Sequence, residues 1–234
     1  CKGLVVANDA DPVRVNTLKL RYDRCRSPNL MLTCARAEDL HSRISSYMAS
    51  NPQESTPHNT LFDRIVADVP CSGDGTVRKF PHIYRLFRPR YSLDLHSVQL
   101  QIAKAAVELL KLGGRLVYST CSLNPLEDEA VLCGLLRHYG PERLTLVDIS
   151  PRGENLLPQI EARAGLCSWR VDVDVFLSGE KEGKMQESRE RLPPIVDSMQ
   201  PPSAKEREWM HLERAMRVMP QDMDCGGFFV AVLQ

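Results

Sequence analysis

The amino-acid sequence predicts an α/β fold built on a mostly parallel sheet with helices on both faces. Short apolar runs rich in β-branched residues alternate with segments of helical periodicity, which is the pattern of repeated strand–helix units. At 234 residues, 43% of them hydrophobic, the chain can bury one large or two small cores. None of its apolar runs approaches the ~18 residues of a membrane-spanning helix, so we expect no membrane partner.

The first part of the chain is expected to contain two strand–helix units. Asp11, as N-cap, and Pro12, in the first turn, favour the start of the first helix. The expected elements are a strand over Gly3–Asp9, a helix with the apolar face Val15, Leu18, Tyr22 and Cys25, a strand over Asn29–Cys34, a helix over Ala35–Met48 and a polar stretch over Ala49–Thr60.

The second part repeats the pattern and adds two strands. The expected elements are a strand over Leu61–Val69, a helix with the stripe Leu95, Val98, Ile102, Ala106 and Leu109, a strand over Arg115–Thr120, a helix to about Tyr139, and strands over Arg143–Ile149 and Gly226–Leu233. Gly113 and Gly114 should stop the first of these helices. Asn124 as N-cap, Pro125 in the first position and Glu127 as the partner in a capping box should begin the second.

The segment from 150 to 209 interrupts this pattern, because it is charged, contains several prolines and has few apolar residues. Such a segment cannot bury enough surface to order itself, so we assign it no fold. Within it, Trp169 and the run Val171–Phe176 are expected to form one arm of a hairpin. The predicted domain division is 1–149 with 210–234 as one α/β domain, and 150–209 as a loop-rich insertion.

Charge and cysteine content exclude several classes of function. Thirty basic residues balance thirty acidic ones, so no global field attracts nucleic acid, and any such affinity must come from local clusters. The eight cysteines form no C-x-x-C pair, which argues against a zinc ribbon or a thioredoxin motif, and we expect no metal site. Six of them are expected to be reduced and packed as small hydrophobes in an intracellular protein, nuclear, nucleolar or cytoplasmic, for which we expect a monomer.

Cys71 and Cys121 are the exceptions, because each follows a predicted strand. The stretches that contain them are ADVPCSGDGT and YSTCSLNP. Neighbouring parallel strands lie ~4.8 Å apart, and sites in such sheets lie at the carboxyl ends of the strands, where Asp9 and Asp68 are also expected. A thiolate is a strong nucleophile, so one thiol could attack a substrate while the other manages its release. The alternative is that Cys71 caps its strand and Cys121 packs under the following helix.

The chain resembles the Nop/Sun family of RNA (cytosine-5) methyltransferases, and within it the eukaryotic tRNA-modifying branch, in three stretches: DVPCSGDGT, STCSLNPLEDE and RVMPQDMDCGGFFVAVL. The resemblance covers Gly3–Ile149 and Met210–Leu233. It implies a Rossmann-like class I methyltransferase sheet with an antiparallel C-terminal strand. It also implies S-adenosylmethionine as cofactor and RNA, tRNA above all, as substrate.

The resemblance further implies roles for the residues at the strand ends. Cys121 would add to carbon 6 of a cytosine, so that carbon 5 becomes electron-rich enough to take a methyl group. Cys71 would assist breakdown of the covalent adduct after the transfer. Asp68 would stabilise ring nitrogen 3 of the pyrimidine if protonated, or contact the methionine end of the cofactor if ionised, and both roles stay open.

Cofactor binding is expected to involve Asp9, which ends the first strand visible in this sequence, since an acid there takes the ribose hydroxyls in nucleoside-binding α/β folds; a solvated N-cap or turn aspartate is the alternative. The family's next contact, an acid for the adenine amino group, falls on Arg36 here, with Glu38 and Asp39 nearby. The family's first strand and glycine-containing loop should precede Gly3 and lie centrally in the sheet. We therefore expect these 234 residues alone to have an incompletely covered core, to bind S-adenosylmethionine weakly and to be inactive.

A loop of mixed basic and aromatic residues follows the first cysteine motif and is expected to contact RNA. Such a mixture suits phosphates and unstacked bases, although a solvated basic loop is the alternative. Its basic members are Arg78, Lys79, Arg85 and Arg88, with His82 and Arg90, and its aromatic members are Phe80, Tyr84, Phe87 and Tyr91. The glycine spacing in SGDGTVRK matches neither of the common phosphate-binding loops.

Three other functions stay open beside methylation of RNA. An inactive relative that binds RNA or a partner is suggested by Arg36 and by the expected missing strand, although both cysteines are intact. An acyl transferase or another thiol enzyme is disfavoured, because no histidine lies beside either cysteine in the sequence. DNA is disfavoured as substrate, because the family pattern then implies attack by the Pro-Cys thiol and needs no second thiol at a strand end.

Overall fold

The computed structural model describes residues 3–25, 27–50, 62–88, 90–150, 160–172 and 193–234, and it confirms the α/β class. Its strands are β1 (Val5–Asp9), β2 (Leu30–Cys34), β3 (Phe62–Asp68), β4 (Leu110–Thr120), β5 (Leu146–Val147), β6 (Arg163–Ala164), β7 (Met216–Val218) and β8 (Phe228–Leu233). Its α-helices are α1 (Pro12–Cys25), α2 (Leu40–Ser50), α3 (His82–Leu86), α4 (Tyr91–Glu108), α5 (Glu129–Tyr139), α8 (Ala204–Met210) and α9 (Pro220–Met223).

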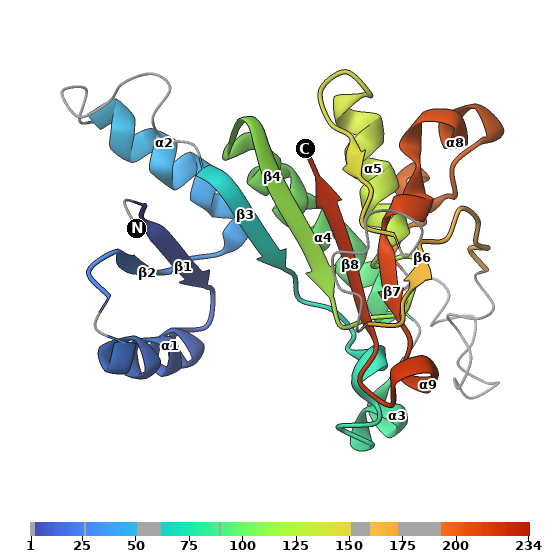
Figure 1. Cartoon of the computed structure of the whole chain (residues 1–234), viewed down its shortest axis with the longest axis horizontal. Helices are drawn as coiled ribbons and strands as arrows, with labels where there is room; N and C mark the ends of the chain where they lie inside the picture. Colours follow the sequence, from blue (N-terminus) through green and yellow to red (C-terminus); the bar gives the residue numbers. More distant parts are fainter. Residues whose placement is uncertain (1–2, 26, 51–61, 89, 151–159, 173–192) are drawn as a thin grey trace.

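The described strands form two sheets (Figure 1). The smaller contains β1 and β2, and the larger has the order β3-β4-β8-β7-β6, with β5 also paired to β8. The larger sheet is mixed, because β3 and β4 are parallel whereas its other described pairs are antiparallel. The antiparallel last strand is confirmed, and the short strands β5, β6 and β7 account for the further antiparallel pairs.

The first strand–helix–strand unit forms as predicted. β1 and β2 pair in parallel from Val5 and Leu30 onward, and α1 connects them. The Asp11 carboxylate accepts a hydrogen bond from the Val13 N–H at 2.8 Å, so Asp11 caps α1 from its predicted position. In Figure 1 this unit lies on the β3 side of the larger sheet, and no described strand pairing joins β1 to β3.

The helix predicted over Ala35–Met48 is divided into two pieces. A 3₁₀ turn, η1 (Ala37–Asp39), leads directly into α2, and both pack against α4. The polar stretch expected after this helix lies, from residue 51 onward, outside the described residues.

β3 and β4 form the parallel pair that carries both cysteine motifs. α4 connects them and ends at Glu108, rather than at the predicted glycines. Gly113 and Gly114 lie inside β4, and Gly113 has a φ of +74° where the register between β3 and β4 shifts. The prediction that these glycines stop the helix is therefore wrong, because strand pairing begins before them, at Leu110.

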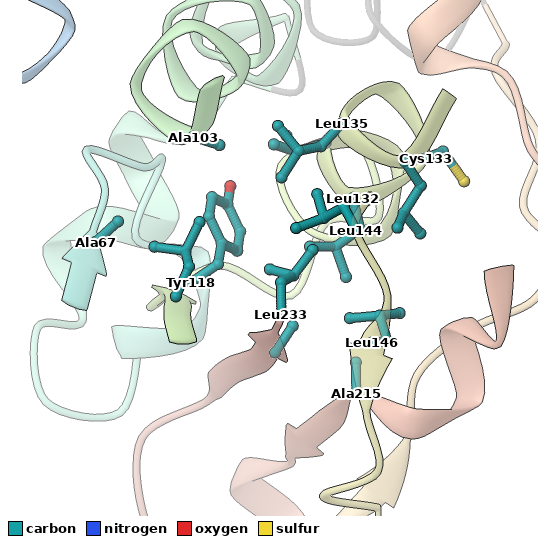
Figure 2. Close-up of a cluster of buried hydrophobic side chains, with 14 of the residues drawn as sticks. Ala67, Ala103, Tyr118, Leu132, Cys133, Leu135, Leu144, Leu146, Ala215 and Leu233 are labelled. Atoms are coloured by element: carbon teal, nitrogen blue, oxygen red, sulfur yellow. The ribbon is translucent and has the colours of Figure 1, made fainter. Parts of the chain in front are cut away.

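The main core lies between the larger sheet and helices α4 and α5, which cover one of its faces (Figure 1). Figure 2 shows Tyr118 of β4 and Leu233 of β8 together with Leu132 of α5 in this core. Val66 of β3 lies on the opposite face and is 71% exposed. The prediction of helices on both faces is therefore wrong at this strand for the part of the chain that the structure describes.

The start of α5 differs from the predicted capping box. Asn124 Oδ1 accepts a hydrogen bond from the Leu126 N–H at 3.0 Å, but α5 itself begins only at Glu129. The Asn124 N–H donates to Ser122 Oγ at 3.0 Å, not to Glu127. The capping-box prediction is wrong because the Glu127 carboxylate is buried among other polar groups.

Part of the segment predicted as an unordered insertion packs on α5. Met199 is 1% exposed, and Trp169 Nε1 donates to the Met199 carbonyl at 2.8 Å. Arg137 of α5 donates to Glu206 of α8 at 2.8 Å, which lowers the pKa of that carboxyl to about 2. The expectation of an unordered segment is wrong for residues 193–209, where Met199 supplies apolar surface for burial, and for β6, which pairs with β7.

The hairpin arm predicted around Trp169 is not observed in the described residues. Residues 169–172 form no strand, and 173–176 lie outside the description. The domain division remains a prediction.

A buried ion pair joins β7 to the start of α5. Arg217, 4% exposed, donates to both carboxylate oxygens of Glu129, and its Nη1 donates to the Leu123 carbonyl at 2.9 Å. Asp128 lies 3.3 Å from the same guanidinium, and burial raises the pKa of its carboxyl well above the ordinary value. Arg217 is thus the cation that two buried acids share.

Replacing Arg217 with Met should lower the free energy of unfolding by about 3–5 kcal/mol, since breaking a buried pair leaves an uncompensated charge. Urea unfolding followed by circular dichroism measures this loss. Arg163→Met is the matched control, because Arg163 holds Asp222 through hydrogen bonds of 2.7 and 2.8 Å at an exposed position and should matter little. Equal losses in the two variants would contradict the stabilising role of the buried pair.

Candidate active site

The two thiols at the strand ends lie in direct contact. Cys71 Sγ is 3.1 Å from Cys121 Sγ, and both side chains are half-buried. Parallel pairing explains the meeting, because Asp68, the last residue of β3, lies opposite Ser119 of β4, and each cysteine follows within three residues. The prediction that the two thiols come together at the strand ends is confirmed, whereas the catalytic site and the separate roles of the two thiols remain predictions.

Main-chain hydrogen bonds tie the two cysteine loops together. The Gly75 N–H donates to the Cys121 carbonyl at 3.0 Å, and the Gly227 N–H donates to the Gly75 carbonyl at 2.6 Å. A Cβ atom at Gly75 would lie 2.7 Å from the carbonyl oxygens of both Cys121 and Gly227, so only glycine permits this approach. Asp74 adds a side-chain link by accepting from the Leu123 N–H at 2.8 Å.

The contact makes the two thiols electrostatically different. The hydrogen bond from Cys71 lowers the pKa of Cys121 to about 7, against the opposing effects of burial and of the nearby Asp68 charge. The same hydrogen bond, followed by burial, raises the pKa of Cys71 above its ordinary value. Near neutral pH a large fraction of Cys121 is therefore ionised while Cys71 stays protonated, which makes Cys121 the better nucleophile.

The structure adds a residue whose place at this site the sequence did not reveal. The Glu127 carboxylate is fully buried and accepts hydrogen bonds from Ser72 and Ser122, the residues that follow the two cysteines. The sequence does place Glu127 close to Cys121, but a glutamate three residues after an asparagine is typical of a capping box. The pattern therefore predicts a helix cap at Glu127 and not a residue of this site.

The two predicted aspartates occupy separate places. Asp68 lies exposed at the end of β3, where its carboxylate accepts from Ser119 Oγ at 3.2 Å. Asp9 lies at the carboxyl end of β1, in the other sheet, where it accepts from the Asp11 N–H at 2.9 Å and pairs with Arg14 Nε at 3.0 Å. The structure thus brings Asp68 to the thiols, and no described interaction joins Asp9 to them.

The three residues discussed for the adenine contact form their own cluster. Arg36 Nε donates to Glu38 Oε1 at 2.7 Å. Burial tends to raise the pKa of Glu38, but main-chain hydrogen bonds and Arg36 outweigh it, so the pKa of Glu38 is lowered. Glu38 and Asp39 line a hollow together with residues of α4. The Arg36 side chain donates its hydrogen bond to Glu38 and not to Asp39.

The basic loop surrounds α3, which Figure 1 places beside α9, beyond the carboxyl end of β4 and the amino end of the antiparallel β8. Arg78 forms an ion pair with Asp224 and donates to the Pro220 carbonyl at 3.2 Å, so its charge is partly neutralised. Lys79 lies over the ring of Phe80, 5.2 Å from the centroid. The other two predicted RNA contacts, Arg85 and Arg88, are exposed, as is the aromatic Tyr84.

The remaining cysteines do not behave as one group. Cys133 is fully buried, and burial raises the pKa of its thiol to about 12. Cys34 is exposed, and Cys167 and Cys225 are half-buried. The expectation that all of them pack as small hydrophobes is wrong for Cys34, because its side chain points from β2 to solvent.

Two negative observations concern only the described residues. Within them, no three His, Cys, Asp or Glu side chains come together in a way that could hold a metal ion. None of their helices is long and apolar enough to cross a membrane.

Comparison with known proteins gives consistent relatives. Residues 1–163 match the family model described as 16S rRNA methyltransferase RsmB/F. The chain is 39% identical over 241 residues to the multisite-specific tRNA:(cytosine-C(5))-methyltransferase trm4b of Schizosaccharomyces pombe, which covers all of this chain and 33% of that protein. It is 36% identical to the tRNA (cytosine(34)-C(5))-methyltransferase of Drosophila melanogaster, over 99% of this chain and 30% of that protein. The chain thus spans about a third of the length of these relatives.

Solved structures show the same fold. A methyltransferase homologue from Pyrococcus horikoshii matches 99% of this chain and 53% of its own with a TM-score of 0.61 at 21% identity. NSun6 from the same organism, solved with SFG, matches all of this chain and 41% of its own with a TM-score of 0.58 at 18% identity. At these identities the likeness concerns the fold alone.

The thiol pair predicts a specific pH dependence of alkylation. Iodoacetamide reacts with thiolates, so its rate at Cys121, followed by mass spectrometry of the peptide, should rise with a midpoint near pH 7. Cys71→Ala removes the hydrogen bond that lowers the Cys121 pKa, so the midpoint should move up and the rate at pH 7 should fall by about tenfold or more. Cys34→Ala, a change at an exposed thiol in β2, should leave the profile unchanged. An unaltered midpoint in Cys71→Ala would contradict the conclusion that the hydrogen bond from Cys71 lowers the pKa of Cys121.

Proposed function

The chain belongs to the RsmB/F methyltransferase family, and from that premise we propose that the protein methylates carbon 5 of cytosine in RNA, with tRNA as its substrate class. The single observation that best supports the chemistry is the 3.1 Å contact between Cys71 and Cys121, with the thiolate on Cys121. Relatives named as tRNA methyltransferases support the substrate class.

In the proposed reaction, Cys121 acts first. Its thiolate forms a bond from Sγ to carbon 6 of the cytosine, and the electron pair of the carbon 5–carbon 6 double bond makes carbon 5 nucleophilic. Because the Cys121 pKa lies near 7, a large fraction of this thiol is ionised at neutral pH without a separate base. Carbon 5 then takes a methyl group, which S-adenosylmethionine would supply when bound.

Cys71 acts in the release of the product. Before the reaction it is held protonated, chiefly by its hydrogen bond to Cys121. Once Cys121 Sγ is bonded to carbon, it carries no charge to hold that proton, so Cys71 can release it to solvent, and the resulting Cys71 thiolate can accept the proton from carbon 5. Loss of this proton restores the carbon 5–carbon 6 double bond, breaks the carbon 6–Sγ bond and returns Cys121 as a thiolate.

Two carboxylates at strand ends fit the cofactor chemically. Asp9 would take the ribose hydroxyls, and its present partner Arg14 is 73% exposed, so that this guanidinium can turn away. Asp68, exposed beside the thiols, would contact either ring nitrogen 3 of the cytosine or the methionine end of the cofactor. The two roles require opposite protonation states of Asp68.

RNA would reach the thiols across the loop around α3. A target cytosine must leave its stack to meet Cys121, at a cost of about a few kcal/mol, which nearby cationic and aromatic groups offset. Arg85, Arg88 and Tyr84 are exposed and available for this contact, whereas Arg78 is engaged by Asp224. We therefore assign the RNA contact of this loop first to Arg85 and Arg88.

Substitution of the two cysteines in the full-length protein separates their roles. Cys121→Ala should abolish 5-methylcytosine and any covalent complex, because no bond to carbon 6 can form. Cys71→Ala should accumulate an RNA–protein complex that survives a denaturing gel, because release is impaired. Cys34→Ala is the control and should behave as the unaltered protein. Product formed by Cys121→Ala would refute the mechanism, and an unaltered protein that binds RNA without methylating it would favour an inactive relative.

Replacing Arg85 and Arg88 together with Ala should weaken RNA binding and reduce the slope of log K against log salt by about 0.7 for each phosphate that these arginines neutralise. A salt series of filter-binding measurements gives this slope. Arg21→Ala with Arg24→Ala on α1 is the matched control, since both are exposed arginines at the same spacing. An identical slope in the α3-loop variant and the unaltered protein would remove this loop from the RNA interface.

A further inference from the structure

Glu127 collects hydrogen bonds from several segments around the two thiols. Its Oε1 accepts from the hydroxyl groups of Ser72 at 2.6 Å, Ser92 at 2.9 Å and Ser122 at 3.0 Å. Its Oε2 accepts from the Ser72 N–H at 2.8 Å and from Gln99 Nε2 at 3.1 Å. The side chain is 0% exposed, so these donors replace the water that a carboxylate would otherwise bind.

The directions of the surrounding hydrogen bonds require an acceptor at this position. Asn124 donates from Nδ2 to Ser92 Oγ at 2.7 Å and from its N–H to Ser122 Oγ at 3.0 Å, so both hydroxyl groups already accept and direct their protons to Glu127. Gln99 Nε2 also donates to a main-chain carbonyl at 2.8 Å, which fixes the face of its amide. An ionised carboxylate accepts all five bonds, whereas an amide would oppose N–H to N–H.

The donors to this carboxylate are the neighbours of the thiols. Ser72 follows Cys71, and the carbonyl to which Gln99 donates belongs to Pro70, directly before it. Ser122 follows Cys121. One carboxylate therefore binds the main-chain N–H after the first thiol directly, reaches the carbonyl before it through Gln99, and binds the side chain of the residue after the second thiol.

We propose that Glu127 is a positioning residue of the methyltransferase site, which keeps the Cys71 thiol donating to the Cys121 thiolate by fixing the two loops that carry them. The inference rests on the proposed function for its meaning in catalysis, but the geometry that it assigns is independent of RNA. Glu127 touches neither sulfur in any described contact, so it acts through Ser72 and Ser122.

The test replaces Glu127 with Gln in the full-length protein and measures iodoacetamide alkylation of Cys121 against pH, without RNA or cofactor. Loss of position weakens the hydrogen bond from Cys71, so the midpoint should rise. A rise of about one unit from 7 lowers the rate at pH 7 about fivefold. If Glu127 acted only through its negative charge, the neutral amide would lower the midpoint and accelerate alkylation. Asp68 and Asp74, the other carboxylates facing Cys121, are unchanged in this variant.

Serine variants provide the matched controls. Ser72→Ala and Ser122→Ala remove bonds next to the thiols and should raise the midpoint, whereas Ser92→Ala removes a bond of similar length to the same carboxylate but flanks neither thiol and should leave it unchanged. Thermal melts show whether each variant folds. If Glu127→Gln does not fold, the comparison of Ser72→Ala and Ser122→Ala with Ser92→Ala tests the proposal. An unaltered or lowered midpoint in folded Glu127→Gln would overturn the proposal.

Methylation assays separate the inference from the proposed function. Glu127→Gln should lower kcat for 5-methylcytosine formation while KM for RNA stays the same, because the loop around α3 is untouched. If the unaltered protein forms no 5-methylcytosine, the proposed function fails whatever the alkylation profile shows. If it forms product and Glu127→Gln alkylates and turns over normally, only the positioning role fails.

Discussion

The parallel pairing of β3 with β4 is the constraint on which the rest of the site depends. It places Asp68 opposite Ser119, and the chain continues from both strands in the same direction to deliver two sulfur atoms to one point. Because the strands are neighbours and their register is regular from Ile65 to Asp68, the thiols that follow reach hydrogen-bonding distance. Their unequal ionisation then follows from proximity, since two adjacent thiols cannot both ionise at little cost.

Polar contacts, more than apolar packing, hold the loops beyond these strands. Gly75, Asp74 and Glu127 each link the first cysteine loop to the second, and each buried acceptor has donors aimed at it. A buried carboxylate is costly unless its oxygens are satisfied, so such a cluster stabilises one arrangement of the loops and penalises others. These contacts fix the loops that carry Cys71 and Cys121, while Asp68, Arg85 of α3 and the nearby Arg88 are exposed.

The sequence predicted the parts of the fold that depend on local pattern. Alternation of apolar runs and helical periodicity predicted β1, α1, β2, β3, α4 and β4, and the carboxyl-end rule brought Cys71 to Cys121. The sequence-based predictions were wrong for features that depend on contacts with residues distant in the chain. Glu127 has the spacing of a capping box but is drawn to Ser72, 55 residues away. Gly113 breaks helices in general, yet β4 had already begun to pair with β3. Residues 193–209 look too polar to order, but the contact of Glu206 with Arg137 and the burial of Met199 hold them on α5.

The position of β8 has a consequence for the order of assembly. This strand fills the centre of the larger sheet between β4 and β7, and its pairing partner Thr120 lies about a hundred positions earlier than Phe229 in the chain. The N–H of Gly227, just before β8, donates to the Gly75 carbonyl and so links this strand to the loop of Cys71. During synthesis on the ribosome, β3 and β4 emerge long before β8, so β4 lacks this neighbour and the loop of Cys71 lacks its link to Gly227 until β8 is added.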